Sequence, residues 1–161
     1  MRVLKDPRAR DVVQKAAETF GWDRWKKRAG FGRGIGFARY KNIAGYCAVA
    51  LEVQVNRRNG RIRVVRAVAA ADSGHIVSPD GIANQIEGGL MQGIGWLTSE
   101  ELWWNGSGEL KTHSPSTYKI PTARDWPVDA RIALLSDAPN REDTIHRSKA
   151  VGEPPLMLAI A

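Results

Sequence analysis

The fold is decided by two segments, Tyr46-Cys-Ala-Val-Ala-Leu-Glu-Val-Gln-Val55 and Ile62-Arg-Val-Val-Arg-Ala-Val-Ala-Ala-Ala71, with Asn59-Gly60 between them. The first alternates apolar and polar residues, with the period of two that is typical of a β-strand. Asn-Gly is the dipeptide favoured in two-residue β-turns, because both positions require positive φ angles. The sequence therefore predicts a long antiparallel hairpin here.

A glycine-rich segment precedes this hairpin and runs from Gly32 to Phe37. A phosphate-binding loop would need a strand before it and a helix after it, whereas this segment continues into Ala38-Arg39-Tyr40. We therefore predict extended chain, in which the glycines permit a bulge or the close approach of another backbone.

Two helix starts flank the predicted strands. Asp6-Pro7 and Ser78-Pro79-Asp80 each combine a capping side chain with a proline in the first turn. The first helix is expected to end at Gly21, and residues 22–30 form a short basic connection. The second helix carries an apolar stripe at helical spacing, formed by Ile82, Ile86, Leu90, Ile94 and Leu97.

The second predicted helix also contains Gly88, Gly89, Gly93 and Gly95. Each glycine inside a helix costs about 1 kcal/mol relative to alanine, so some other contact must compensate. A missing side chain lets another backbone or a ligand lie directly against the helix. Tight packing on a sheet and contact with a cofactor both explain the glycines, and the helix alone does not choose between them.

The remaining segments predict shorter elements. Residues 101–112 indicate a second hairpin, 113–127 a loop and 128–135 another strand, while the polar residues 136–149 form a further loop. The chain stops inside what we interpret as the first turns of a helix, so we expect a truncated sequence. The fold class is α+β: antiparallel hairpins and a sheet packed against the glycine-rich helix, after a basic helical segment over residues 1–30.

Charge is unevenly distributed along the 161 residues. The net charge is +7, yet residues 1–66 hold 17 Lys and Arg against 5 Asp and Glu. Part of this excess follows the predicted hairpin, at Arg57, Arg58, Arg61, Arg63 and Arg66. Such spreading is typical of a solvated face, or of a surface that meets another part of an assembly. Nucleic-acid binding is the weaker interpretation.

Composition excludes several other classes of protein. The single cysteine, Cys47, excludes an internal disulfide and a metal site built only from this chain's cysteines. No apolar run approaches the roughly 18–20 residues of a membrane helix, and the N-terminus lacks the apolar core of a secretory signal. We therefore expect a globular protein of the cytoplasm.

The most informative motif is Gly152-Glu153-Pro154-Pro155. Glycine allows a sharp turn, the prolines stiffen the entry into a helix, and a helix N-terminus favours the ionised carboxylate. A carboxylate held in this way can act as a general base. From spacing alone, an ordinary helix-start role for Glu153 remains the alternative.

Other polar residues carry weaker signals. Asp72 follows a strand directly, so it is interpreted as a turn cap rather than a catalytic residue. The three histidines lack the spacing of metal ligands and are interpreted as surface residues: His75, His113 and His146.

Three segments, in this order, resemble one family: Asp72-Ser-Gly-His-Ile-Val-Ser-Pro79, Gln85-Ile-Glu-Gly-Gly-Leu-Met-Gln-Gly93 and Ser148-Lys-Ala-Val-Gly-Glu-Pro-Pro155. They resemble the C-terminal region of the molybdopterin-binding subunit of the xanthine dehydrogenase/aldehyde oxidase family. Ser114-Pro-Ser-Thr-Tyr-Lys-Ile-Pro121 resembles the family's loop after the glycine-rich helix. The resemblance covers residues 31–161, which are therefore expected to be part of a molybdopterin-binding domain.

This resemblance implies an oxidoreductase with molybdenum bound to a pyranopterin dithiolene. A glutamate matching Glu153 takes the proton from a hydroxyl ligand of the metal, whose oxygen then attacks an aldehyde or an N-heterocycle such as a purine. Gln85 matches the glutamine that hydrogen-bonds the cofactor, and Gly88 and Gly89 belong to the same motif. Lys149 and Gly152 match the adjoining loop, and no residue of this chain is expected to ligate the metal.

The family's subunit is several times longer than this chain. We therefore expect a fragment that neither holds molybdopterin tightly nor turns over substrate alone. Its expected partners are the rest of the molybdenum subunit, an iron–sulfur subunit and a flavin subunit with FAD, in the cytoplasm or, as for some relatives, the periplasm. The alternatives are a non-catalytic structural module of the same fold and, last, a basic nucleic-acid-binding domain.

Overall fold

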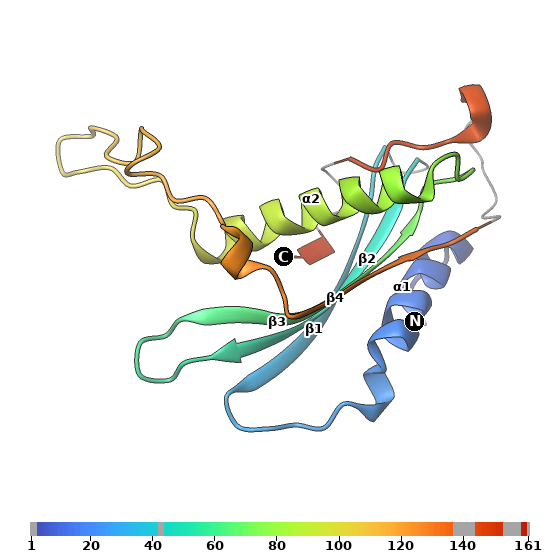
Figure 1. Ribbon diagram of the computed structural model, residues 1–161, viewed down its shortest axis with the longest axis horizontal. Coiled ribbons are helices and arrows are strands. Elements are labelled where there is room, and N and C mark those ends of the chain that lie inside the picture. Colours follow the sequence, from blue (N-terminus) through green and yellow to red (C-terminus); the bar gives the residue numbers. More distant parts are fainter. Residues whose placement is uncertain (1–2, 42–43, 137–143, 153–158, 161) are drawn as a thin grey trace.

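The computed structural model describes residues 3–41, 44–136, 144–152 and 159–160, and Figure 1 shows their arrangement. Four strands form one sheet in the order β1-β2-β3-β4: β1 (Phe31–Arg39), β2 (Tyr46–Val55), β3 (Ile62–Asp72) and β4 (Asp129–Leu134). The first three strands pair antiparallel, as the sequence predicts, whereas β4 pairs parallel to β3. The α+β fold class is confirmed.

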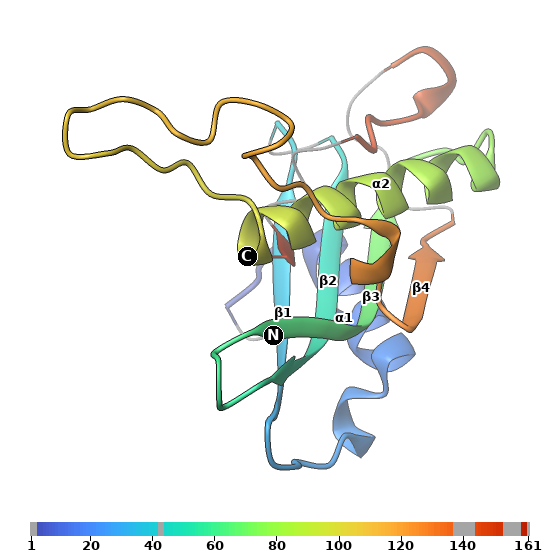
Figure 2. The ribbon, with the colours of Figure 1, turned by 60° about the vertical axis from the view of Figure 1, so that its left-hand side comes forward.

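Two helices cover opposite faces of this sheet (Figures 1 and 2). Helix α1 (Pro7–Phe20) packs on the face that carries Tyr46, Ala48 and Ala70. Helix α2 (Pro79–Thr98) packs on the other face, which carries residues of opposite parity such as Cys47 and Val49. Both faces of the central strands are therefore buried, which explains why β3 is continuously apolar over residues 67–71.

Both helix starts have the capping contacts that the sequence predicts. The Asp6 carboxylate accepts a hydrogen bond from the backbone N–H of Arg8, at 3.0 Å, and the Ser78 hydroxyl accepts one from Gly81, at 3.2 Å. Helix α1 ends at Gly21, whose φ of 71° is in the left-handed region that glycine tolerates. Along the predicted apolar stripe of α2, Ile86, Leu90 and Ile94 are buried, but Leu97 is 50% exposed, contrary to the prediction.

The turn of the central hairpin differs from the prediction. The backbone N–H of Asn56 donates to the carbonyl of Arg61, at 2.8 Å, so residues 57–60 form a four-residue loop rather than a two-residue turn. Gly60 has a φ of 71°, but Asn59 does not share the positive φ that the two-residue turn requires. The Asn-Gly signal therefore identified the hairpin but not its loop length.

The predicted second hairpin is present, with an antiparallel bridge between Trp104 and Leu110 and backbone hydrogen bonds from Asn105 to Glu109 and from Lys111 to Trp103. In Figure 2, the chain after α2 extends away from the body as a long arm. Leu102, Trp103 and Trp104 are each more than half exposed there. The pairing is short because the exposed arm has no packed face.

Close packing explains one glycine of β1 directly. A Cβ atom on Gly36 would overlap the backbone carbonyl of Ala159, which lies buried in the same core as α2. The expected close approach of another backbone is therefore found at this position. Cys47 is buried in the same core, and burial raises the pKa of its thiol to about 12, which keeps it protonated at neutral pH.

Candidate functional site

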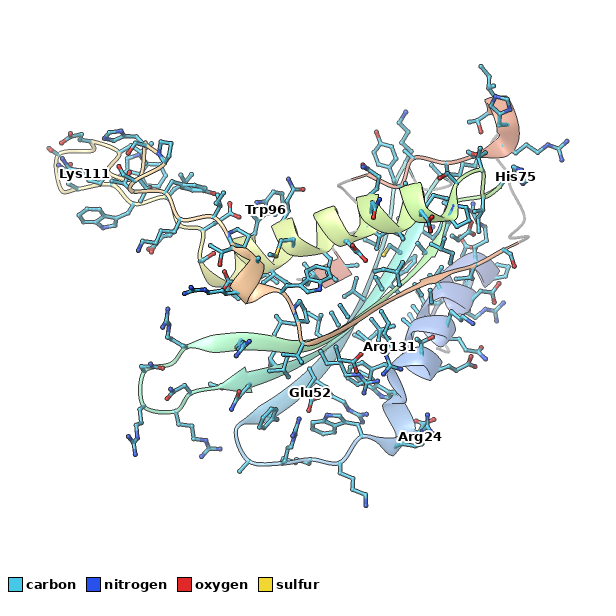
Figure 3. All side chains as sticks on the ribbon, in the orientation of Figure 1. Arg24, Glu52, His75, Trp96, Lys111 and Arg131 are labelled. Carbon is cyan, nitrogen blue, oxygen red and sulfur yellow. The ribbon has the colours of Figure 1, made fainter. Side chains whose placement is uncertain are left out.

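An open groove of about 550 Å³ runs along the part of α2 that faces away from the sheet. Figure 3 shows Trp96 on this side of the helix, with Lys111 at the far end of the arm. The groove is lined by residues from α2, from the base of the arm and from the loop after β4: Asn84, Gln85, Gly88, Gly89, Met91, Gln92, Trp96, Glu100, Ile120, Pro121 and Gly152.

The groove brings together four of the six residues that the sequence analysis named as catalytic or cofactor-binding. Gln85, Gly88 and Gly89 come from α2, and Gly152 comes from a segment more than sixty residues later in the chain. The fifth residue, Lys149, does not line the groove. The sixth, Glu153, lies outside the described residues, as do Pro154 and Pro155.

Lys149 occupies a buried position next to the end of β3. Its side chain is largely buried, and its backbone N–H donates to the carbonyl of Ser73, at 2.7 Å. This hydrogen bond anchors the chain three residues before Gly152, so Lys149 fixes the course of the loop that borders the groove.

The helix glycines have two different explanations. A Cβ on Gly93 would overlap the side chain of Ile160, and one on Gly95 would lie 2.5 Å from Cδ of Pro121. These two glycines are therefore required by packing within the protein. A Cβ on Gly88 would meet no atom within 4 Å, although Gly88 lines the groove. Packing within the described structure therefore gives no reason for glycine at position 88. A ligand that lies against the helix in this groove would give one.

Three side-chain amides along the groove are available to a ligand. Asn84, Gln85 and Gln92 are exposed, and none of them hydrogen-bonds another of the residues that the structure describes. An amide both donates and accepts hydrogen bonds, so this wall can match a heterocycle that presents both kinds of group. No carboxylate of α2 lines the groove, and Glu100, at the base of the arm, is already bonded to Tyr118.

The opposite wall of the groove was not assigned from the sequence. Ile120 and Pro121 form it, and the Tyr118 hydroxyl donates to the Glu100 carboxylate at 2.5 Å, which ties this wall to the end of α2. The bond to Glu100, followed by burial, raises the pKa of Tyr118. The sequence analysis related the segment Ser114–Pro121 to the family's loop after the glycine-rich helix, but the contact of Pro121 with Gly95, which brings this loop to the groove, is visible only in the structure.

The remaining candidates occupy structural or surface positions. Asp72 is a turn cap, as predicted, since it accepts the N–H of Gly74 at 3.0 Å. His75, His113 and His146 are all exposed, also as predicted. Within the described part of the chain, no three His, Cys, Asp or Glu residues lie together as a metal-binding group. None of the described helices has the length and hydrophobicity needed to cross a membrane.

A second groove, of about 410 Å³, lies between the β2–β3 hairpin and the end of α2. Arg61, Arg63 and Arg124 line it together with Asp125. The Asp125 carboxylate accepts hydrogen bonds from Thr122, which lower its pKa, and the two residues form the capping box of a short 3₁₀ turn. Of the described residues that were assigned to a site from the sequence, none lines this groove.

Comparison with known proteins places these features in one family. Residues 38–127 match the model of the molybdopterin cofactor-binding domain. Xanthine dehydrogenase of Dictyostelium discoideum is 41% identical over 132 residues, which are 82% of this chain and 9% of that protein. Xanthine dehydrogenase/oxidase of Rattus norvegicus is 41% identical over 114 residues, 71% of this chain and 8% of that protein.

Solved structures show the same relationship. Quinoline 2-oxidoreductase from Pseudomonas putida 86 superposes on 72% of this chain and 14% of its own, with a TM-score of 0.62 and 28% identity. The aldehyde oxidoreductase from Desulfovibrio desulfuricans ATCC 27774 superposes on 72% and 12%, with a TM-score of 0.61 and 32% identity. This chain spans 8–9% of the length of the two xanthine dehydrogenase relatives described above. The chain belongs to the molybdopterin cofactor-binding domains of the xanthine dehydrogenase/aldehyde oxidase family.

Proposed function

We propose that this chain forms the α2 wall of a molybdopterin site in an oxidoreductase that hydroxylates an aldehyde or an N-heterocycle such as a purine. The observation that carries the proposal is the groove itself. Gln85, Gly88, Gly89 and Gly152 all line it, and the chain belongs to a cofactor-binding family. Packing within the described protein does not require the glycine at position 88.

The groove fits a flat, polar heterocycle. In this proposal, the Gln85 amide hydrogen-bonds the pterin, and Asn84 and Gln92 supply further donors and acceptors along the same face of α2. Gly88 leaves the helix backbone bare, so that the ring system can approach it closely, and Gly89 lines the same groove. When bound, the cofactor supplies the redox chemistry, while the protein supplies binding, orientation and proton transfer.

We propose Glu153 as the general base that removes a proton from the attacking hydroxyl group. Its neighbour Gly152 lines the groove, which supports a role at this site for the next residue of the chain. Lys149 anchors the same loop through its backbone N–H. We therefore assign Lys149 a supporting role rather than a direct contact with the cofactor.

The rest of the site is proposed to come from the remainder of the molybdenum subunit. Further pterin contacts and the substrate-binding residues lie there, and electrons leave through iron–sulfur clusters and FAD on partner subunits or domains. The names of the relatives, which include xanthine dehydrogenase, quinoline 2-oxidoreductase and aldehyde oxidoreductase, support substrates of the purine, N-heterocycle and aldehyde classes. The chain alone is expected to be inactive.

Filling the groove tests this proposal. In the complete molybdenum subunit, Gly88→Leu is expected to lower molybdopterin occupancy by about 10-fold or more, because the added side chain occupies space reserved for the ring. Molybdenum is measured by mass spectrometry, and the pterin by the fluorescence of its oxidised form. Stability of the chain should not fall, since the new side chain meets open space and replaces a helix glycine.

Glu87→Leu is the matched control, because Glu87 is exposed on the same helix turn and does not line the groove. It should leave occupancy unchanged. Full occupancy in Gly88→Leu would show that the pterin does not lie against α2. A non-catalytic structural module predicts no molybdopterin even in the unsubstituted subunit.

A further inference from the structure

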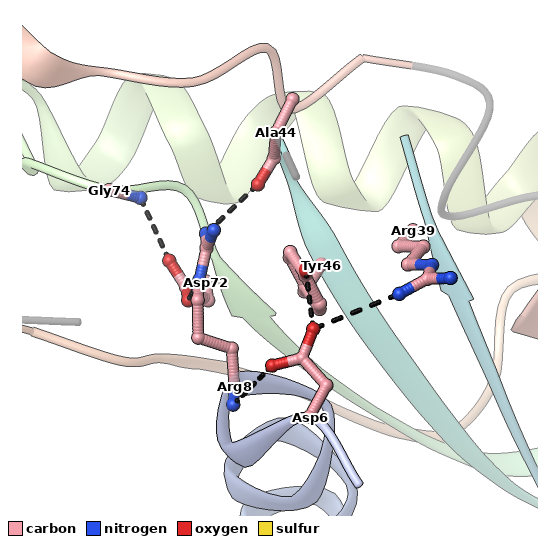
Figure 4. A network of polar contacts seen from close by, with 7 residues as sticks. All are labelled: Asp6, Arg8, Arg39, Ala44, Tyr46, Asp72 and Gly74. Carbon is pink, nitrogen blue, oxygen red and sulfur yellow. Dashed lines mark hydrogen bonds and ion pairs between the residues drawn. The ribbon is translucent and has the colours of Figure 1, made fainter. Parts of the chain in front are cut away.

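We propose that Arg8, on helix α1, is a positioning residue for the loop that borders the groove. The proposal rests on the function proposed above for that groove. It assigns a role to α1, which lies outside the residues 38–127 that match the family model. Figure 4 shows the polar network on which the inference is based.

Arg8 joins α1 to two separate segments at one end of the sheet, next to the start of β2 and at the end of β3. Its Nε lies 2.5 Å from a carboxylate oxygen of Asp72, and a terminal nitrogen donates to the carbonyl of Ala44 at 2.9 Å. Both charged side chains are only 1% exposed. The guanidinium also lies 4.2 Å from the ring centre of Tyr46. The planar guanidinium reaches both acceptors at once, which a lysine ammonium at the same position would not.

Each of these two segments in turn contacts the loop over residues 147–150. On the Asp72 side, the N–H of Lys149 donates to the carbonyl of Ser73 at 2.7 Å. The N–H of His75 donates to the carbonyl of Arg147 at 3.0 Å. The hydroxyl of Ser148 also donates to the carbonyl of His75, at 2.8 Å. The two stretches thus form a short antiparallel pair that begins immediately after Asp72.

On the Ala44 side, the neighbouring Gly45 lies against the same loop. A Cβ atom on Gly45 would be 2.5 Å from the carbonyl oxygen of Ala150, so only glycine permits this approach. Arg8 therefore holds both surfaces on which the loop rests. Two residues beyond Ala150, the chain reaches Gly152 in the wall of the groove.

Hydrogen exchange in the unliganded chain tests this inference. The double substitution Arg8→Met/Asp72→Asn removes both charges, leaves no unpaired buried ion, and keeps an oxygen that can accept the Gly74 N–H. We expect the Lys149 and His75 amides to exchange about 10-fold faster or more, because their local opening becomes easier. The amides of Ala48 and Val68, at the centre of the sheet, should keep their protection.

Arg8→Lys is the second variant, since it keeps the charge beside Asp72 but not the reach to Ala44, and it should give the same selective effect. Arg10→Met is the matched control, because Arg10 lies on the same helix but is exposed. Unchanged exchange at Lys149 and His75, or an equal acceleration of all four amides, would overturn the inference. Because no ligand is present, the result does not depend on whether the groove binds a pterin.

Discussion

Replacing Glu153 by glutamine in the complete molybdenum subunit should lower kcat by roughly 10²- to 10⁴-fold, the range that a positioned general base contributes. Glutamine preserves the size and shape of the side chain but cannot accept the proton. The loss should therefore appear in kcat, with molybdenum and pterin content unchanged. The measurement is steady-state reduction of a dye with an aldehyde or a purine as substrate, normalised to bound molybdenum.

Glu101→Gln is the matched control, because Glu101 is exposed at the base of the arm and does not line the groove. It should leave kcat and molybdenum content unaltered. A Glu153→Gln subunit with full metal content and a kcat within about twofold of the parent would rule out the role of Glu153 as base, since that role requires a loss of at least about 10²-fold. It would leave the cofactor-binding role of α2 in place.

The second large effect concerns folding. Gly36→Ala is expected to lower the free energy of unfolding of this chain by about 3 kcal/mol, at the upper end of typical overpacking costs. The new methyl group would overlap the backbone carbonyl of Ala159, and a backbone atom cannot move aside as the end of a flexible side chain can. Denaturant titration followed by circular dichroism measures the change.

Gly34→Ala provides the comparison within the same strand. Gly34 lies two residues before Gly36 on the same face of β1, but a Cβ there meets no atom within 4 Å. Alanine at this position should be neutral or stabilise by about 0.5–1 kcal/mol, because it reduces the entropy of the unfolded chain. Equal effects of the two substitutions would show that Ala159 does not pack on β1.

Local signals in the sequence predicted most of the secondary structure. The alternation over β2 and β3, the caps at Asp6 and Ser78, and the glycine at position 21 each depend on neighbouring residues only. For that reason, they can be recognised without knowledge of the tertiary structure. The predicted loop length of the central hairpin was wrong, because Asn-Gly is compatible with more than one loop length. The structure has the longer loop, which the Asn56–Arg61 hydrogen bond closes.

Features that depend on distant residues could not be predicted. Arg8 and Asp72 are 64 positions apart, and the sequence next to either residue does not indicate a buried ion pair. The parallel pairing of β4 likewise depends on the path of the long arm that precedes it. The hairpin within this arm was predicted from the sequence, but the exposure of Leu102 and Trp104 was not, because it depends on how far the arm extends from the sheet.

The candidate site was likewise predicted from the sequence only in part. The motif from Gln85 to Gly93 and the glycine at 152 were recognised through a family resemblance, and the structure brings Gln85 and Gly152 to one groove. The sequence did not separate the helix glycines into those that packing requires and the one at 88 that it does not, because that distinction needs the positions of Ile160 and Pro121.

The central claim is that the pterin lies against the bare face of α2. A crystal structure of the complete molybdenum subunit with its cofactor tests it most directly. We predict that the Gln85 amide will lie within about 3.2 Å of a pterin heteroatom, as a hydrogen bond requires, with Gly88 in contact with the ring system. A pterin bound elsewhere, with the Gln85 amide facing solvent, would contradict the account.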